Sequence, residues 1–217
     1  MALKLPPKLP KLLEKVIRFG ALQWKDGKLL LHGIPVFIAL ASTIILQQKI
    51  LDNVCGKSMT CSIMYSLAKL QAKQGTAVMM ERFGYAHKIE DKKKIFEFNM
   101  GQSDVLGSGK LIGIKLDFNK QIFIIKSKST FAEEYKRTFG LETHPVDYFL
   151  RGSLAGGLEP LVNKKMLCIE TKCVAQGNPY CIFVIKPIEK WDKKTLKKEN
   201  IKDVDFKKLG ANLPGLY

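Results

Sequence analysis

Alternation of apolar and polar residues predicts two β-hairpins in the second half of the chain. The segment 110–127 alternates on both sides of Asn-Lys at 119–120, which suits a tight turn. The segment 165–187 is apolar and rich in β-favouring residues on both sides of Gly-Asn-Pro at 177–179. Glycine takes positive φ and proline cannot donate to a ladder, so these three residues should form the turn of the second hairpin.

Apolar residues at helical spacing predict helices before and between the hairpins. The segments are 36–54, 58–74 or 58–83, 87–99, 131–139 and 146–162. We therefore expect an α+β fold with an antiparallel sheet of four or five strands, covered by helices on one face. The two hairpins supply four strands, and a strand near residue 30 would be the fifth.

The second hairpin carries candidate metal ligands. Cys173 and Cys181 lie symmetrically about Gly177, so pairing across the hairpin would place their Cβ atoms about 4.5 to 5.5 Å apart. Residues three apart in an ideal strand point to opposite faces, so Glu170 reaches the thiols only through a bulge or twist at 171–172. Two thiols and a carboxylate are three of the four ligands of a tetrahedral zinc site. A pair of reduced cross-strand thiols is the alternative.

The same segment resembles the end of the 4-vinyl-reductase domain family. The matching features are Glu-x-x-Cys at 170–173, a small residue followed by Gly at 177, Cys181, and Ile-Phe-Val at 182–184. The segment 146–157 (VDYFLRGSLAGG) resembles the helix that precedes this hairpin in the family.

This resemblance implies a ligand-binding domain of the nitric-oxide-signalling and Golgi-transport type. The fold is shared by the aromatic-sensing domains of bacterial regulators that respond to phenol, and by small subunits of the Golgi tethering complex. In those sensors a third Cys before the Gly-containing helix completes a metal site, and here Asp147 holds that position, with His144 nearby. The implied zinc ligands are therefore Asp147, Glu170, Cys173 and Cys181. Related domains form homodimers, so the resemblance also implies pairing through the helix 146–162 and the first long helix.

Length and composition favour one domain with two basic flanks. The chain has 217 residues, of which 46% are apolar, enough for a core. We expect a basic arm and short helix over 1–26, the ligand-binding domain over 27–187, and a Lys-rich tail over 188–217. Five cysteines without a recognisable signal peptide favour a cytoplasmic location. The longest apolar run, 34–46, is shorter than the roughly 20 residues that span a bilayer, so we expect no transmembrane segment.

The formal net charge of +16 is the most unusual property of the composition. Only four of the 36 basic residues are arginine, whereas base readout and bidentate phosphate contacts favour arginine. The sequence also lacks helix-turn-helix, zinc-finger and RNA-recognition signatures. We expect a solvated, Lys-rich surface and no specific nucleic-acid partner, with weak attraction to phosphate or anionic membranes as the alternative.

Residue patterns typical of catalysis are lacking in the sequence. None of the three histidines has an acid and a nucleophile at motif spacing, and dinucleotide fingerprints are missing. We therefore expect no nucleotide cofactor and a sensory or carrier module that binds a small hydrophobic or aromatic molecule and acts through a dimer or a separate effector protein. The alternatives are reduction of a tetrapyrrole vinyl group, as the family name implies, and a structural tethering or assembly role. Aromatic placement suggests as ligand-binding residues Phe83, Tyr85, Phe98, Phe123, Tyr148 and Phe149.

Overall fold

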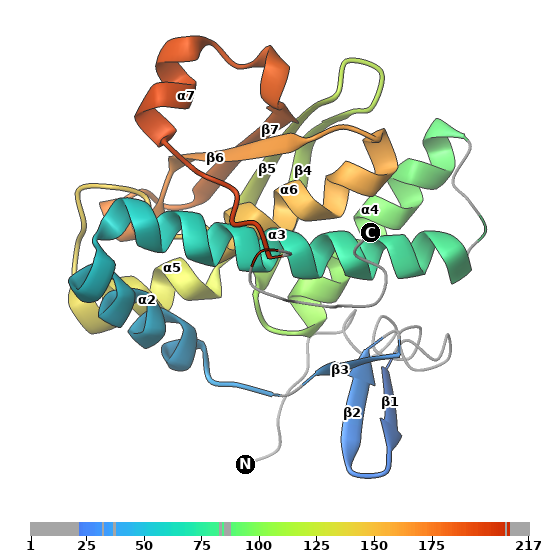
Figure 1. Ribbon diagram of the computed structural model, residues 1–217, viewed down its shortest axis with the longest axis horizontal. Coiled ribbons are helices and arrows are strands. Elements are labelled where there is room, and N and C mark those ends of the chain that lie inside the picture. The colour runs from blue at the N-terminus through green and yellow to red at the C-terminus, as the bar shows by residue number, and fades with distance from the viewer. Residues whose placement is uncertain are drawn as a thin grey trace.

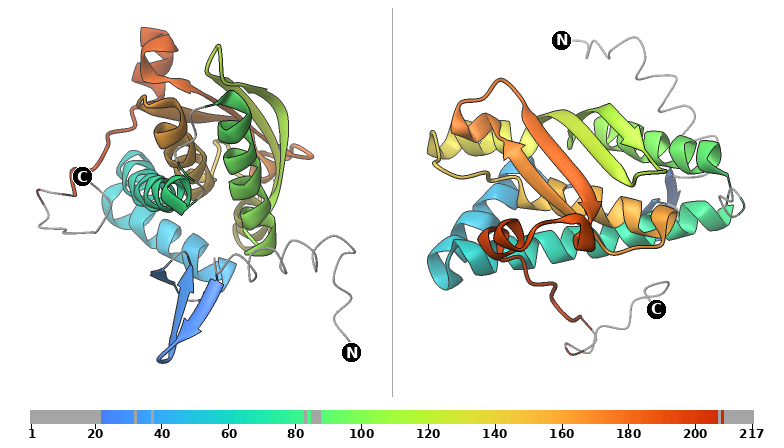
Figure 2. Two further views of the ribbon diagram at one scale, coloured as in Figure 1. Left: turned by 90° about the vertical axis from the view of Figure 1, so that its right-hand side faces the viewer. Right: turned by 90° about the horizontal axis from the view of Figure 1, so that it is seen from above.

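A four-stranded antiparallel sheet with strand order β4-β5-β7-β6 organises the protein. The computed structural model describes residues 22–31, 33–36, 38–82, 84, 88–206 and 208. Figure 2 shows α4 and α6 against one face of the sheet, with α3 packed on the far side of α6. The bounds are β4 (Gly109–Asp117), β5 (Ile122–Ser129), β6 (Met166–Lys172), β7 (Cys181–Pro187), α3 (Lys57–Arg82), α4 (Ile89–Val105) and α6 (Tyr148–Val162). The predicted α+β class is confirmed.

The strand predicted near residue 30 belongs to a separate three-stranded sheet and does not join the main one. Figure 1 shows this small sheet below the body of the protein. It uses residues 34–36, so the helix predicted from residue 36 begins only at Ala41. The remaining elements are β1 (Leu22–Lys25), β2 (Lys28–Leu31), β3 (Ile34–Val36), α2 (Ala41–Cys55), α5 (Thr130–Phe139), α7 (Lys193–Glu199) and the short 3₁₀ turns η1 (Val174–Gln176) and η2 (Ile188–Lys190).

Side chains alternate strictly between the two faces of the central strands. On the face toward the helices, Phe123 pairs with Ile185 and Ile125 pairs with Phe183, and all four side chains are fully buried. The intervening residues of β5 and β7 point the other way and are half-buried or exposed. The core therefore lies between the sheet and α4 and α6, on one side of the sheet only.

Two glycines of α6 allow it to approach α3 closely. A Cβ atom on Gly152 would collide with the carbonyl oxygen of Tyr65, and one on Gly156 with the carbonyl oxygen of Lys69. Helix α6 is buried around most of its circumference, as expected of a helix enclosed between a sheet and a second helix. Glycine at these two positions is therefore a packing requirement.

The chain after α7 runs along α3 and is hydrogen-bonded to its serines. The backbone N–H of Lys202 donates to Ser62 Oγ (3.1 Å), and that of Val204 donates to Ser66 Oγ (3.0 Å). Two residues of extended chain advance about 6.6 Å and four residues of helix about 6 Å. Every second residue of the C-terminal segment therefore lies beside a serine, and the two serines are one turn of α3 apart.

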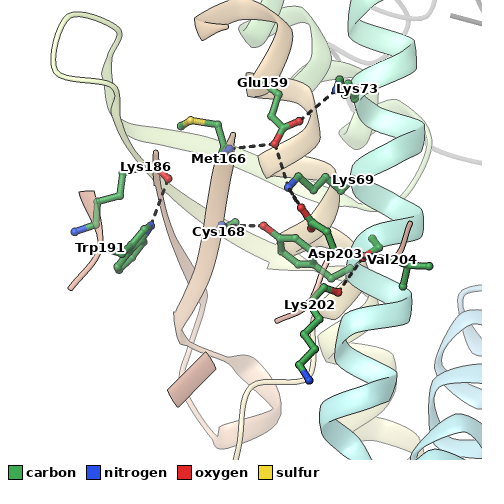
Figure 3. A network of polar contacts seen from close by, with 12 residues as sticks. Lys69, Lys73, Glu159, Met166, Cys168, Lys186, Trp191, Lys202, Asp203 and Val204 are labelled. Carbon is green, nitrogen blue, oxygen red and sulfur yellow. Dashed lines mark hydrogen bonds and ion pairs between the residues drawn. The ribbon is translucent and has the colours of Figure 1, made fainter. Parts of the chain in front are cut away.

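One turn further along α3, a nearly buried lysine joins three parts of the fold. Lys69 Nζ lies 3.0 Å from Glu159 on α6 and 3.1 Å from Asp203 on the C-terminal segment. Glu159 Oε1 also accepts a hydrogen bond from the backbone N–H of Met166, which begins β6 (3.1 Å). Figure 3 shows this network, which ties α3, α6, the sheet and the C-terminal segment together.

Candidate functional site

Glu170, Cys173 and Cys181 form a buried cluster at the end of the hairpin where β6 connects to β7. One potential ligand atom from each residue lies within 4.8 Å of the other two. The β6–β7 register shifts between Glu170 and Lys172, which confirms the predicted irregularity at 171–172. This shift brings the carboxylate round to the side of the thiols.

The two thiols meet by a different route from the one predicted. Cys181 pairs with Ser127 of β5, and Cys173 lies beyond the last paired residue of β6, at the start of η1. Gly177 closes η1 in the left-handed region, with φ at 88°. The predicted placement as direct cross-strand neighbours is wrong because the chain makes a 3₁₀ turn before it returns, and this turn folds one thiol back over the other.

Asp147 lies beside the cluster and forms the N-cap of α6. Its Oδ1 accepts a hydrogen bond from the backbone N–H of Leu150 (3.2 Å), and its own N–H donates to Glu170 Oε2 (3.1 Å). Asp147 Oδ2 and Glu170 Oε1 are buried and have no hydrogen-bond partner among the described residues. Buried carboxylate oxygens of this kind call for a proton or a cation. His144 instead lies 3.1 Å from Glu142, and burial lowers the pKa of its imidazole.

Burial and crowding of acidic groups shape the protonation of the cluster. Burial raises the pKa of Asp147 to about 8, and the nearby Glu170 carboxylate acts in the same direction. Burial, followed by the proximity of Cys173, raises the pKa of Glu170 well above its ordinary value. The hydrogen bond with Cys181 lowers the pKa of Cys173 to about 7. Near neutral pH the carboxyl groups therefore retain protons that a bound cation would replace.

Arg151 is the buried positive charge that lowers the pKa of both carboxyl groups. Its side chain is 4% exposed, its Nε donates to the carbonyl oxygen of Cys168 (3.2 Å), and its Nη2 contacts Glu199. The guanidinium charge opposes burial by lowering the pKa of Asp147 and Glu170. Arg151 therefore partly offsets the negative charge that the cluster would carry when ionised.

A second feature is a pocket of about 490 Å³ between α3, α4 and α6. Strand β4 and the small sheet complete its wall. Most of the lining is apolar, and no charged side chain lies among the described residues that form it. Asn99 Nδ2 donates to Thr76 Oγ1 (2.9 Å) within this wall. The apolar part of the wall includes Ile44, Phe96, Met100, Leu106, Phe149 and Leu154.

The predicted ligand-binding residues are scattered in the structure. Phe149 lines the pocket. Phe123 is fully buried in the main core, Phe98 packs against that core, and Tyr148 belongs to a smaller cluster with Cys61 and Met64. Phe83 and Tyr85 lie outside the described residues.

Sequence reasoning missed all the described pocket residues except Phe149, among them Phe96, Thr76 and Asn99. Thr76 and Asn99 share their helix faces with other polar residues, such as Lys73 and Gln102, so no local signal in the sequence singles them out. Their proximity could not have been deduced, because it depends on how α3 and α4 pack.

Comparison with known proteins agrees with the family resemblance. Residues 129–187 match the family model of the 4-vinyl-reductase domain, which confirms the resemblance over this part of the chain. Over 106 residues the chain is 39% identical to an uncharacterized protein, MJ1460, of Methanocaldococcus jannaschii. That alignment covers 48% of this chain and 59% of the relative, so the chain spans less than two thirds of the relative's length.

A solved sensory domain shares the fold. The phenol-responsive sensory domain of the transcription activator PoxR, solved with phenol, superposes with a TM-score of 0.74 at 17% identity, over 91% of this chain and 99% of that one. A vinyl-4-reductase family protein from Methanocaldococcus jannaschii gives a TM-score of 0.45 at 20% identity, over 87% and 99% of the two chains. None of the described helices is both long and apolar enough to cross a membrane.

Proposed function

We propose that this protein is a cytoplasmic sensory or carrier module that binds a small, neutral, largely apolar molecule in the pocket between α3, α4 and α6. The pocket itself carries the proposal. Its volume of about 490 Å³ lies within the range of roughly 300 to 1,000 Å³ that is typical of small-molecule sites. The match to the 4-vinyl-reductase domain and the fold shared with the sensory domain of PoxR support this function.

The chemistry of the wall defines the class of ligand. A charged ligand would lose its hydration without gaining an opposite charge, because the lining residues are uncharged. Uncharged amide and hydroxyl side chains, Thr76 and Asn99 among them, offer hydrogen-bonding groups within a largely apolar wall. The preferred ligand is therefore apolar over most of its surface, with a few polar atoms.

The pocket gives less support to the two alternative functions. Reduction of a vinyl group requires a proton donor, and within the described part of the chain no titratable side chain lines the pocket. A purely structural tethering role would be favoured by a filled interior, whereas this cavity is open enough for a ligand. Native mass spectrometry of protein purified from its own cells would identify the ligand, metal and oligomeric state together.

Filling the pocket from α3 should abolish ligand binding. Ala72 lines the pocket, so an Ala72→Phe variant should lower affinity for the neutral dye Nile red at least tenfold, equivalent to about 1.4 kcal/mol. Ala77 lies on the same helix but is not among the lining residues, so Ala77→Phe is the matched control. Fluorescence titration measures both. Equal affinities for the two variants would contradict this location of the site.

The buried cluster supports a second proposal, a structural zinc ion held by Glu170, Cys173, Cys181 and Asp147. Thiolates and carboxylates are suitable zinc ligands, and the unpartnered oxygens of Glu170 and Asp147 fit a cation. When bound, zinc would cross-link the four residues. It would have no open coordination position for chemistry, because all four ligands come from the protein. The residues themselves would hold the hairpin formed by β6 and β7 against the start of α6.

We further propose that the protein forms a homodimer through α2. Leu46, Ile50 and Val54 recur every four residues along this helix and are 47%, 61% and 77% exposed. They form an apolar stripe on one helix face. Helix α6, the other element suggested by the resemblance, is largely buried within one chain, so α2 provides the available contact surface.

A charge in the middle of this stripe should separate the dimer. Light scattering at tens of micromolar should show a dimer for the unmodified protein and a monomer for Ile50→Glu, because a carboxylate would be buried without a partner. Gln47→Glu adds the same charge at an exposed position of the same helix and should leave the dimer intact. A monomeric unmodified protein would refute the proposal.

A further inference from the structure

The face of the main sheet that points away from the helices combines lysine and aliphatic side chains in rows. Cross-strand partners share a face, and one row crosses all four strands through Ile112, Lys126, Ile182 and Lys172. Figure 2 shows α3, α4 and α6 on the opposite side of the sheet. On β4, β5 and β7, the face that points away from α3, α4 and α6 is therefore not covered by these helices.

The charge on this face is strongly one-sided. Among the described strand residues of this face, Asp117 is the only acid, and it lies 4.0 Å from Lys115. Asp192, at the start of α7, is close enough to Lys186 for that lysine to contribute to lowering its pKa. The other lysines of the face have no acidic partner within 4.0 Å in the described part of the chain. Alternation along the strands places six lysines here: Lys110, Lys115, Lys126, Lys128, Lys172 and Lys186.

One pair of lysines destabilises the isolated sheet, and a third lysine is held in place by an aromatic ring. Lys110 and Lys128 are direct cross-strand partners, and like charges in that position are destabilising. Lys126 Nζ lies 3.5 Å from the centre of the Tyr180 ring, so its ammonium group is held at the face of the sheet by a cation–π contact.

Aliphatic side chains between the lysines also lack cover. Ile112 and Ile114 on the edge strand β4 are 46% and 57% exposed. Ile124, Ile182 and Val184 are half-buried and lie outside the packed core cluster. A partner that fits this face must therefore bring both negative charge and apolar groups.

We infer that the outer face of the sheet, defined by its six lysines and the isoleucines between them, docks an acidic, amphipathic helix of a partner protein. A second copy of this chain does not fit, because it would present the same positive charge. A helix that carries acids every four residues repeats them about every 6 Å, close to the spacing of about 6.6 Å between Lys126 and Lys128 on one strand. Its apolar residues would cover the isoleucines.

Two other anionic partners fit less well. Single-stranded nucleic acid is bound through free aromatic faces, and here the rings of Tyr180 and Trp191 already face Lys126 and Lys186. Insertion into a bilayer requires protruding apolar groups, whereas the aliphatic side chains of this face are embedded in a sheet. Docking of a helix on this face does not depend on what the internal pocket binds.

Isoleucine methyl NMR can locate the docking site directly. The probe is a synthetic helical peptide with Glu at every fourth position and Leu on the adjacent positions, and the same peptide with Lys in place of Glu is its control. The acidic peptide should shift the methyl signals of Ile112, Ile124 and Ile182, and the basic peptide should not. Shifts confined to isoleucines on other elements would overturn the assignment.

Charge reversal tests the lysines. A Lys126→Glu, Lys128→Glu double variant should bind the acidic peptide at least tenfold more weakly, whereas Lys93→Glu with Lys94→Glu on α4 changes the net charge equally and should have an effect of about twofold or less. Lys128→Glu alone should weaken binding without lowering the melting temperature, because it removes the like-charge contact with Lys110.

Two outcomes would overturn the inference. Equal losses for the two double variants would indicate attraction to net charge only. Binding of single-stranded DNA or phosphatidylserine vesicles that requires Lys126 and Lys128, without binding of the acidic peptide, would assign the face to a different class of partner.

Discussion

Replacement of Gly156 by alanine is expected to remove a substantial part of the protein's free energy of unfolding. A Cβ atom there would collide with the backbone carbonyl oxygen of Lys69, and a backbone atom cannot move aside as a side chain can. Relief requires α3 and α6 to separate, which opens the most extensive helix contact of the fold. Overpacking of this kind costs about 3 kcal/mol or more, against a total stability of roughly 5 to 15 kcal/mol.

The neighbouring glycine provides a matched control. A Cβ atom on Gly157 would lie 3.6 Å from Thr76 Oγ1, an ordinary contact distance. Alanine favours a helix interior over glycine by about 1 kcal/mol, so Gly157→Ala should raise the free energy of unfolding. Urea denaturation of the two variants measures the difference. Similar stabilities for Gly156→Ala and Gly157→Ala would show that the helices are not in the close contact described.

Zinc should bind the cluster and raise the melting temperature substantially. Protein made in zinc-supplemented medium is expected to contain about one zinc per chain, and a chelator should remove the ion together with its stabilisation. The Cys173→Ser, Cys181→Ser double variant should lose both the metal and the chelator effect. Cys55, an exposed cysteine, gives the control Cys55→Ser. A metal-free protein whose melting is unchanged in the double variant would leave only a pair of buried thiols.

The pH dependence of the same cluster has a definite sign. Without metal, Asp147 retains its proton in the folded state up to about pH 8, whereas the unfolded chain loses it near its ordinary value of 3.8. The folded state therefore binds more protons in this window, so its stability falls as pH rises from about 4 to 8, by at most about 1.4 kcal/mol per pH unit for this group. Zinc affinity should rise over the same window because protons compete with the metal. Asp147→Asn preserves a capping side chain and should flatten the metal-free profile.

The sequence predicted local features well because they depend on neighbouring residues. Alternation identified both hairpins of the main sheet. Ser129, a residue type that favours N-caps, caps α5: its Oγ accepts a hydrogen bond from the N–H of Ala132 (3.3 Å). The irregularity beside Glu170 followed from the two-residue period of a strand. These features require only geometry within one segment.

Features set by packing were beyond sequence reasoning. Phe123 and Phe149 are both aromatic and lie near predicted elements, yet one is enclosed in the core and the other lines the pocket. Phe149 lies on α6, so whether it faces the pocket depends on the rotation of α6 against α3. Gly152 and Gly156 fix that rotation, because they face α3 at the points of closest approach. Periodicity identified the buried faces but gave no relative orientation of the helices.

The hydrogen bonds between the C-terminal segment and α3 have a consequence for biosynthesis. Ser62 and Lys202 are 140 residues apart in the chain, and Ser66 and Val204 are 138 apart. At about 5 to 20 residues per second, roughly 7 to 28 seconds of translation separate the two partners. During that interval the serine face of α3 is already made but has no segment to cover it. A ribosome that stalls before residue 200 would therefore hold a nascent chain whose longest helix is exposed to chaperones along this side.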